Sequence, residues 1–269
     1  MTATGLIGAV VWFPLRAIIG ACVALRIHPN VLTLVGLLIN VAAAWALAQG
    51  RFVLAGVIMT AANIFDFVDG KVAQALKLSS RFGGFWDSVL DRFSDISLFV
   101  GLIYLYSRLD RTDYVMVTAL AMMFAVLTSY TRARAESVID KCKVGFMERP
   151  ERIVLFMIGA FTNRMAAVLW VVLVLSVSTV FARIYFTWRV LQAAEGKRVR
   201  FEPERDLPMP FRAVWHALYW TFERATWQYD VMVVLILSFV WLTPPDWLAD
   251  PVAHGMGLLG RLFSGGAAL

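Results

Sequence analysis

Six long apolar stretches limit most strongly how this chain of 269 residues can fold. Inside hydrocarbon, backbone N–H and C=O groups must be satisfied within the spanning segment, and a helix of about 20 apolar residues crosses a bilayer. The composition agrees, because 60% of the residues are hydrophobic and only 16% are charged, whereas soluble domains carry about 25% charged residues. We therefore expect an all-α integral membrane fold built on a six-helix transmembrane bundle. The stretches cover about 31–49, 52–77, 82–107, 114–137, 150–163 and 166–192. The fifth is short for a span and is expected to tilt or to be embedded only locally.

The segment before the bundle differs from a clean span. Residues 5–27 are apolar but are interrupted by Pro14, Arg16 and Arg26. This pattern favours an N-terminal interfacial helix, within residues 1–29, that lies on the bilayer. Pro29 is expected to end this element, and Asn30 is expected to cap the helix that follows. The bundle itself is expected to occupy residues 30–192.

The segment after the bundle falls into two parts. Residues 193–212 are polar and are expected to form a cytoplasmic linker. Residues 213–269 are rich in tryptophan, which is typical of anchoring at a membrane interface, so we expect a membrane-associated C-terminal extension. Within it, residues 226–247 fit a seventh span, and a re-entrant or surface helix fits them nearly as well.

Basic residues are distributed unevenly between the connections, and this orients the spans. Cytoplasmic loops carry the excess of lysine and arginine in membrane proteins. The poor set of connections carries Arg51, Arg108, Arg111 and Arg164. The rich set carries Lys77, Arg81, Lys141, Lys143, Arg149, Arg152, Lys197, Arg198, Arg200, Arg205 and Arg212. We expect the rich set to face the cytoplasm from a multi-pass position in the cell (inner) membrane.

Net charge and cysteine content narrow the possible partners. The net charge of +6 suits contact with anionic lipid. A nucleic-acid partner is not expected, because no soluble basic domain is present to bind one. The two cysteines, Cys22 and Cys142, are expected to be reduced thiols.

Four aspartates stand inside otherwise apolar predicted helices, where a charge is costly and usually functional. Asp66 and Asp69 share one helical face with Gly70 and Ala73, at spacings of i, i+3, i+4 and i+7. Asp87 and Asp91 share a face of the next helix at i, i+4. A short turn at about 78–81 makes the two helices antiparallel, so the two carboxylate pairs are expected to face each other at similar depth.

Carboxylates this close cannot all stay ionised in a dry site without a cation. Hard divalent ions with oxygen ligands, Mg²⁺ or Mn²⁺, are the natural partners. Metal held by carboxylates near the cytoplasmic surface points to phosphate chemistry. Small residues at Gly70, Ala73 and Gly83 would let a ligand approach the backbone. The alternative is that the aspartates pair with arginines and hold the helices together.

The same residues carry a family resemblance. The pattern Asp66-x-x-Asp69-Gly70-x-x-Ala73-Gln74, then eight residues, then Gly83-x-x-x-Asp87-x-x-x-Asp91 resembles the signature of the CDP-alcohol phosphotransferase family, DxxDGxxAR followed by GxxxDxxxD. The chain departs from it at Gln74, where the family has arginine, and this could alter contacts to a diphosphate. The start His28-Pro29-Asn30-x-x-Thr33 resembles the family's TPNxxT. The resemblance covers roughly residues 25–192.

The resemblance implies a reaction that releases CMP. A CDP-linked lipid such as CDP-diacylglycerol would bind with its diphosphate on two metal ions, and an acceptor hydroxyl would attack the β-phosphorus. It implies that Asp66, Asp69 and Asp87 are metal ligands and that Asp91 is the general base and also contacts metal. A homodimer is implied by the family alone. The implied nucleotide-binding residues are Asn30, Thr33, Asp69, Gly70, Ala73, Gln74 and Gly83.

Three arginines on separate predicted helices form a candidate acceptor site. Arg132, Arg152 and Arg183 are expected near the same cytoplasmic depth, and an arginine within a span normally meets an anion. A phosphate on the acceptor would suit them. The alternative is snorkelling together with pairing to nearby glutamates, which are Glu136, Glu148 and Glu151.

A looser pattern narrows the acceptor. The sequence SYxRARAE, then ERPER, then a later arginine resembles the phosphatidylinositol-phosphate synthase branch of the family, in which the positions of Arg132, Arg152 and Arg183 face the acceptor phosphate. That branch commonly has lysine at the position of Arg132. The resemblance implies a phosphorylated polyol acceptor such as inositol phosphate. A phosphatidylglycerophosphate synthase using glycerol 3-phosphate is the alternative within the family.

Two functions of other classes are alternatives to the enzyme. A cation transporter would spread its carboxylates along a path over several spans, whereas these cluster on two adjacent helices beside small residues. A catalytically silent membrane scaffold is made conceivable by Gln74, but the intact Asp91 argues against it.

Overall fold

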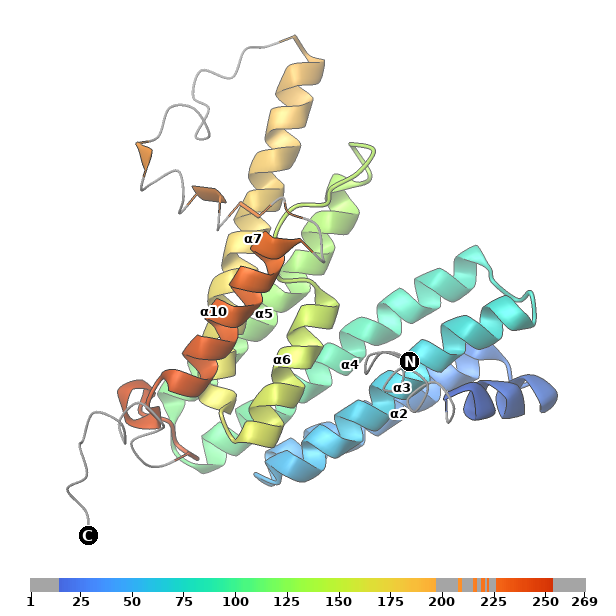
Figure 1. The fold of residues 1–269 in the computed structure, drawn as a ribbon, viewed down its shortest axis with the longest axis horizontal. Coiled ribbons are helices and arrows are strands. Elements are labelled where there is room, and N and C mark those ends of the chain that lie inside the picture. The colour runs from blue at the N-terminus through green and yellow to red at the C-terminus, as the bar shows by residue number, and fades with distance from the viewer. Residues whose placement is uncertain are drawn as a thin grey trace, which may run out of the picture. The chain divides into compact units, whose positions relative to one another are not determined.

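The computed structural model describes residues 15–196, 208–209, 215–216, 219–220, 222 and 226–253. All regular secondary structure in this part of the chain is helical (Figure 1), as the hydropathy pattern predicts. A helix lies at each of the six apolar stretches, with ends within a few residues of those expected. The helices are α2 Pro29–Ala48, α3 Phe52–Ala75, α4 Arg81–Arg108, α5 Thr112–Ala135, α6 Arg149–Thr162, α7 Met165–Ala194 and α10 Trp227–Leu242, followed by a 3-10 turn, η1, at Pro245–Leu248.

Four of these helices, α2, α3, α5 and α7, are long and apolar enough to cross a membrane. Helix α4 has 28 residues but carries too many charged side chains, its aspartates among them, to join that group. Helix α6 has 14 residues and α10 has 16, so they rise about 21 and 24 Å, less than the roughly 30 Å of a hydrocarbon core. Most of the predicted linker, including residues 197–207, lies outside the described residues.

The chain divides into two compact units, Met1–Leu105 and Tyr106–Leu269, and each is described by itself. In the first unit, α2 and α3 pack together along their length and are joined by a tight turn at Gly50, whose φ is +70°. A short helix, Leu15–Ala24, packs on this pair. Its residue Cys22 is buried with Leu32, Val68 and Val72. Within the described part of residues 1–29, the predicted N-terminal helix is therefore present over Leu15–Ala24.

The start of α2 corrects one sequence prediction. His28, and not Asn30, is the N-cap residue: its Nδ1 accepts a hydrogen bond of 3.2 Å from the backbone N–H of Asn30. Pro29 occupies the first turn of α2, where its missing N–H has no cost. Asn30 is therefore the second residue of α2 and not the residue before it.

Helix α4 crosses α2 at very close range. A Cβ added to Gly101 would overlap the backbone of Ala44, and close approach of this kind through small residues is how helices pack in membranes. Nearby, Asn40 Nδ2 donates a 2.6 Å hydrogen bond to Ser94 Oγ, and both side chains are buried. One glycine contact and one buried polar pair therefore contribute to the position of α4 against α2.

We expect Gly101→Ala to destabilise the protein, because the added methyl group forces α4 away from α2. Overpacking of a well-packed contact costs about 1–3 kcal/mol, so the apparent melting temperature of the detergent-purified protein should fall. Gly20→Ala is the matched control, since its Cβ would meet nothing within 4 Å. Equal melting temperatures for the two variants would contradict the close crossing.

The second unit is organised around α7. Helices α5, α6 and α10 each pack against it, and Figure 1 shows α5 and α7 side by side. Helix α10 lies within residues 226–247, the stretch that fits a seventh span and also a re-entrant or surface helix. Its N-cap Thr226 accepts a hydrogen bond from the backbone N–H of Tyr229 at 3.4 Å. Beyond α10, the hydroxyl of Tyr114 donates to the carbonyl of Leu248 at 2.5 Å, which ties η1 to α5.

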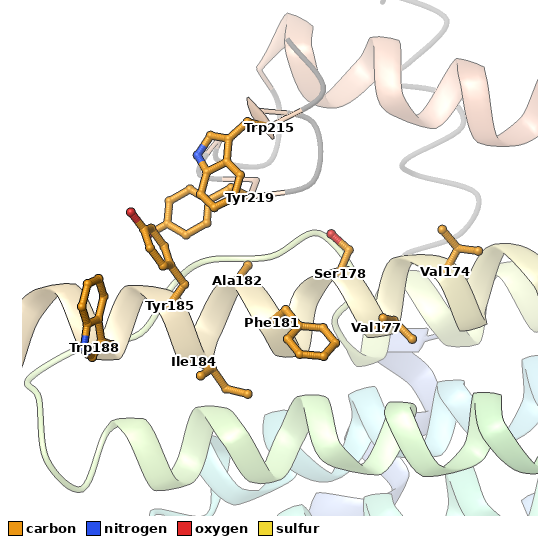
Figure 2. Close-up of a pocket in the computed structure, with 10 residues that line it drawn as sticks. All are labelled: Val174, Val177, Ser178, Phe181, Ala182, Ile184, Tyr185, Trp188, Trp215 and Tyr219. Atoms are coloured by element: carbon orange, nitrogen blue, oxygen red, sulfur yellow. The ribbon is translucent and has the colours of Figure 1, made fainter. Parts of the chain in front are cut away.

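An apolar groove of about 600 Å³ runs along the outer face of α7 (Figure 2). Its floor includes Val174, Phe181 and Ile184, all exposed, and one end is bordered by tyrosines and tryptophans. An exposed apolar groove is typical of a surface that contacts lipid or another protein. Both cysteines are buried free thiols, as expected. Burial raises the pKa of the Cys142 thiol.

Candidate active site

Three aspartates of the first unit come together. Asp66 and Asp69 on α3 and Asp87 on α4 each offer a carboxylate oxygen, and these oxygens lie within 4.8 Å of one another. Asp69 is buried, whereas Asp66 and Asp87 are half-buried. The i, i+3 spacing on one helix and the antiparallel turn to the next produce the facing arrangement that the sequence predicts.

Thr33 on α2 holds one of these carboxylates. Its hydroxyl lies 2.7 Å from Asp69 Oδ2, to which it donates, and 3.2 Å from the carbonyl of Pro29. Thr33 is itself buried. A hydrogen-bonded partner of this kind fixes the orientation of a metal-ligating carboxylate, so α2, α3 and α4 all contribute to the aspartate cluster.

A cavity of about 270 Å³ lies next to Asp69 and Asp87. All seven residues predicted to bind the nucleotide line it: Asn30, Thr33, Asp69, Gly70, Ala73, Gln74 and Gly83. Gly70 and Gly84 have open space where a Cβ would project, so a ligand can approach the backbone of both helices there. Gln74, in the position of the family arginine, is exposed at this cavity.

The turn before α4 supplies lining residues that the sequence did not single out. Ser79, Ser80 and Gly84 also border the cavity. Ser80 Oγ accepts a 3.0 Å hydrogen bond from the backbone N–H of Gly83, which is the geometry of an N-cap. The signal was present in the sequence as a serine directly before a helix, followed by two glycines.

Asp91 lies one turn beyond Asp87 on α4, about 6 Å along the helix axis. It does not belong to the group of three whose oxygens meet within 4.8 Å. Its Oδ2 is 3.4 Å from Nη1 of the adjacent Arg92, with which it forms an ion pair. The residue pattern does not predict this pair. Asp95, a further turn along, is buried.

The cluster of Asp66, Asp69 and Asp87 fits a divalent metal ion. Three carboxylate oxygens within 4.8 Å are hard ligands with a net negative charge, the donor set that Mg²⁺ and Mn²⁺ prefer.

The three predicted acceptor arginines lie in the second unit. Arg183 on α7 is only 2% exposed. Its Nε donates to the carbonyl of Val144 at 3.0 Å, Nη1 donates to the carbonyl of Thr128, and Nη2 donates to Glu148 Oε1 at 3.2 Å. The guanidinium therefore joins the end of α5, the loop after it and the residue that precedes α6.

Glu148 brings two of the arginines together. Arg132 Nη1 donates to the same Glu148 Oε1 at 2.8 Å, and Arg132 Nε donates to Glu136 Oε1 at 3.1 Å. Arg152, on the first turn of α6, is 1% exposed. Pairing with glutamates, the alternative to phosphate binding, is therefore present for Arg132 and Arg183.

Comparison with known proteins identifies the class. The family model of CDP-alcohol phosphatidyltransferases matches residues 26–192, which include the aspartate cluster, its cavity and the three arginines. The chain belongs to the CDP-alcohol phosphatidyltransferase family, and it is an enzyme of that family, which excludes the cation-transporter hypothesis. The C-terminal extension lies beyond the matched residues.

Similar proteins that synthesise inositol-phosphate lipids agree with the branch resemblance. The archaetidylinositol phosphate synthase of Pyrococcus horikoshii is 35% identical over 173 residues, which are 64% of this chain and 89% of that one. A crystal structure of the Mycobacterium tuberculosis phosphatidylinositol phosphate synthase with CDP-DAG bound has a TM-score of 0.61 and 26% identity, covering 65% of this chain and 93% of that one. The same enzyme in complex with manganese and citrate has a TM-score of 0.57 and 25% identity, covering 65% and 88%.

We expect Thr33→Val to weaken metal binding, because the substitution removes the hydroxyl that orients Asp69 and keeps the side-chain shape. Loss of such an outer partner typically costs 10- to 100-fold in metal affinity, and Mn²⁺ titration followed by electron paramagnetic resonance measures it. Thr60→Val on α3 is the control, since the Thr60 hydroxyl donates to Gly56 of its own helix at 2.8 Å. Unchanged Mn²⁺ affinity in Thr33→Val would contradict the role of the Thr33 hydroxyl in orienting a metal ligand.

Proposed function

We propose that this chain transfers the phosphatidyl group of CDP-diacylglycerol to inositol phosphate and releases CMP. The observation that carries the proposal is the placement of three clustered aspartates beside a cavity lined by all seven expected nucleotide residues. The relatives named above, which make inositol-phosphate lipids, favour inositol phosphate over glycerol 3-phosphate as the acceptor.

The proposed reaction assigns each aspartate a part. Asp66, Asp69 and Asp87 would hold the divalent metal, which when bound neutralises charge on the diphosphate. Asp91 accepts the proton of the acceptor hydroxyl, and the resulting oxygen nucleophile attacks the β-phosphorus. The bond from that phosphorus to the oxygen bridging the two phosphates breaks, so a phosphodiester forms and CMP leaves with the bridging oxygen. The open backbone at Gly70 and Gly84 accommodates the nucleotide side.

The arginines of the second unit are proposed to bind the acceptor phosphate. Arg152 and Arg183 are buried cations, and a buried guanidinium is a strong and directional partner for a phosphate. Arg132 meets Arg183 at Glu148, so the positive charge of two side chains is gathered around one carboxylate.

The membrane setting belongs to the same proposal. The six helices α2 to α7 would form the transmembrane bundle in the inner membrane, with the aspartate ends facing the cytoplasm on the basic side of the chain. The extension would associate with the membrane through its tryptophans. Two ions, Mg²⁺ or Mn²⁺, and a homodimer complete the proposal, and the relative solved with manganese supports the choice of ion.

We expect the purified protein to release CMP from CDP-diacylglycerol when Mg²⁺ and inositol phosphate are both supplied. Asp91→Asn should lower this rate by at least about 100-fold, because general-base catalysis contributes roughly 10²–10⁴, while Mn²⁺ binding stays near the native value. Asp113→Asn, an exposed aspartate paired with Arg111, serves as the control.

A panel of acceptors decides between the family alternatives. Faster CMP release with glycerol 3-phosphate than with inositol phosphate would favour a phosphatidylglycerophosphate synthase. Absence of CMP release with every free or phosphorylated polyol would leave a silent scaffold and contradict the enzyme.

The family departure at Gln74 gives a separate prediction. Gln74→Arg adds a cation at the cavity beside the expected diphosphate, and an exposed pair contributes about 0.2–1 kcal/mol, so the KM for CDP-diacylglycerol should fall by roughly 1.5- to 5-fold. Gln49→Arg adds the same charge at the C-terminal end of α2 and should leave this KM unchanged. An equal effect of both substitutions would mean that net charge, and not the cavity, is responsible.

A further inference from the structure

The loop between α5 and α6 is fixed to α7 on one side. The backbone N–H of Met147 donates to Thr179 Oγ1 at 3.1 Å, and Arg183 Nε donates to the carbonyl of Val144. Gly145 has a φ of +92°, and a Cβ at this position would overlap Thr179. The loop therefore approaches α7 as closely as its backbone allows, immediately before Glu148.

The C-terminal extension contacts the same loop. The backbone N–H of Gly145 donates a 2.8 Å hydrogen bond to the carbonyl of Trp220. The ring of Phe146 meets two aromatic rings of the extension, that of Trp220 edge-on at 5.2 Å and that of Tyr229 at 5.3 Å. Aromatic contacts of this geometry contribute about 0.5–1.5 kcal/mol in addition to the free energy of burying their surface. The extension therefore stabilises the position of the loop.

Tyr229 also reaches the first turn of α6. Its hydroxyl lies 3.1 Å from Glu151 Oε1, to which it donates. Glu151 is buried and is the neighbour of Arg152 in the sequence. A hydrogen bond to a buried carboxylate is costly to lose, so Tyr229 couples α10 to the turn that carries Arg152.

The extension is itself anchored on α7. Trp215 and Tyr219 stack on each other at 5.3 Å, and both meet Tyr185 of α7 edge-on at 5.2 and 5.6 Å. Figure 2 shows the three rings gathered at one end of the apolar groove. Tyr219 is buried together with Cys142 and Val144 of the loop. The extension thus contacts both the helix that bears Arg183 and the loop that leads to Arg152.

We propose that Trp220 and Tyr229 are positioning residues for the acceptor-phosphate arginines, acting through the segment 142–152. The inference rests on the proposed function, in which those arginines bind the acceptor. Residues of this extension lie beyond the matched family domain, so the chain adds a further support to a loop that is also bonded to α7. Small displacements of a binding group weaken productive binding. Loss of this support should therefore raise the KM for the acceptor and leave the KM for the CDP-lipid unchanged.

The test is the Tyr229→Phe variant, which removes one hydroxyl and keeps the ring against Phe146. The KM for inositol phosphate should rise by roughly 3- to 10-fold, the range for one lost hydrogen bond of ordinary strength, while the KM for CDP-diacylglycerol stays unchanged. Trp227→Phe is the matched control on the same helical turn, since Trp227 is 72% exposed. An equal change in both KM values would indicate a general structural effect and overturn the positioning role.

A double-mutant cycle tests whether Tyr229 acts through Glu151. If it does, Tyr229→Phe combined with Glu151→Ala should raise the acceptor KM no further than Glu151→Ala alone. Additive effects of the two substitutions would overturn the route through Glu151.

Hydrogen exchange separates this inference from the proposed function. Tyr229→Ala should speed exchange of the amides in 143–152, including that of Gly145, whereas Trp227→Ala should not. A wild-type protein that releases no CMP with inositol phosphate contradicts the proposed function, whatever the exchange shows. A wild-type protein that does release CMP, with an acceptor KM and loop exchange unaltered by the Tyr229 variants, contradicts the positioning role alone.

Discussion

Electrostatic repulsion between clustered carboxylates is the constraint on which the first unit depends. Two unit charges 4.8 Å apart repel by roughly 3–4 kcal/mol at an effective dielectric constant near 20. Three such pairs, before screening by solvent in the cavity, approach the whole stability of a typical domain, about 5–15 kcal/mol. A cation held by Asp66, Asp69 and Asp87 would convert this cost into attraction. The close crossing of Gly101 on Ala44 restrains α4 against α2. A set of metal ligands requires such restraint, because the ligands must not move apart.

Much of this site follows from local periodicity. The spacing of aspartates and small residues on two consecutive helices is sufficient to place them on facing surfaces, since each helix has 3.6 residues per turn and the turn between them is short. Helix limits were also predictable, because hydropathy changes sharply at the membrane boundary: 114–137 was expected where the structure has Thr112–Ala135. Asp91 was grouped with the other three from the same spacing, yet the oxygens that meet within 4.8 Å belong to Asp66, Asp69 and Asp87.

Contacts between distant parts of the sequence were not predictable in the same way. Arg183 bonds to the carbonyls of Thr128 and Val144, and backbone acceptors leave no trace in residue types. The cap at His28 is not predictable from residue preference, because asparagine fills the N-cap position more often than histidine does. The contacts of Tyr229 with Glu151 and Phe146 depend on how the extension returns to α7, which neither hydropathy nor spacing encodes.

Pairing of the arginines with Glu148 and binding of an acceptor phosphate are compatible. The bonds described for Arg183 go to two backbone carbonyls and one carboxylate, and they use three of the five N–H donors that a guanidinium carries. The backbone bonds fix the plane and direction of the guanidinium. The two carbonyls lie in α5 and in a loop bonded to α7, so they do not move when a ligand binds. Glu148 is different, since its side chain is 27% exposed and is shared with Arg132. A phosphate entering this cluster would therefore compete with Glu148 alone, and the segment that presents Glu148 is the one that α7 and the C-terminal extension hold between them.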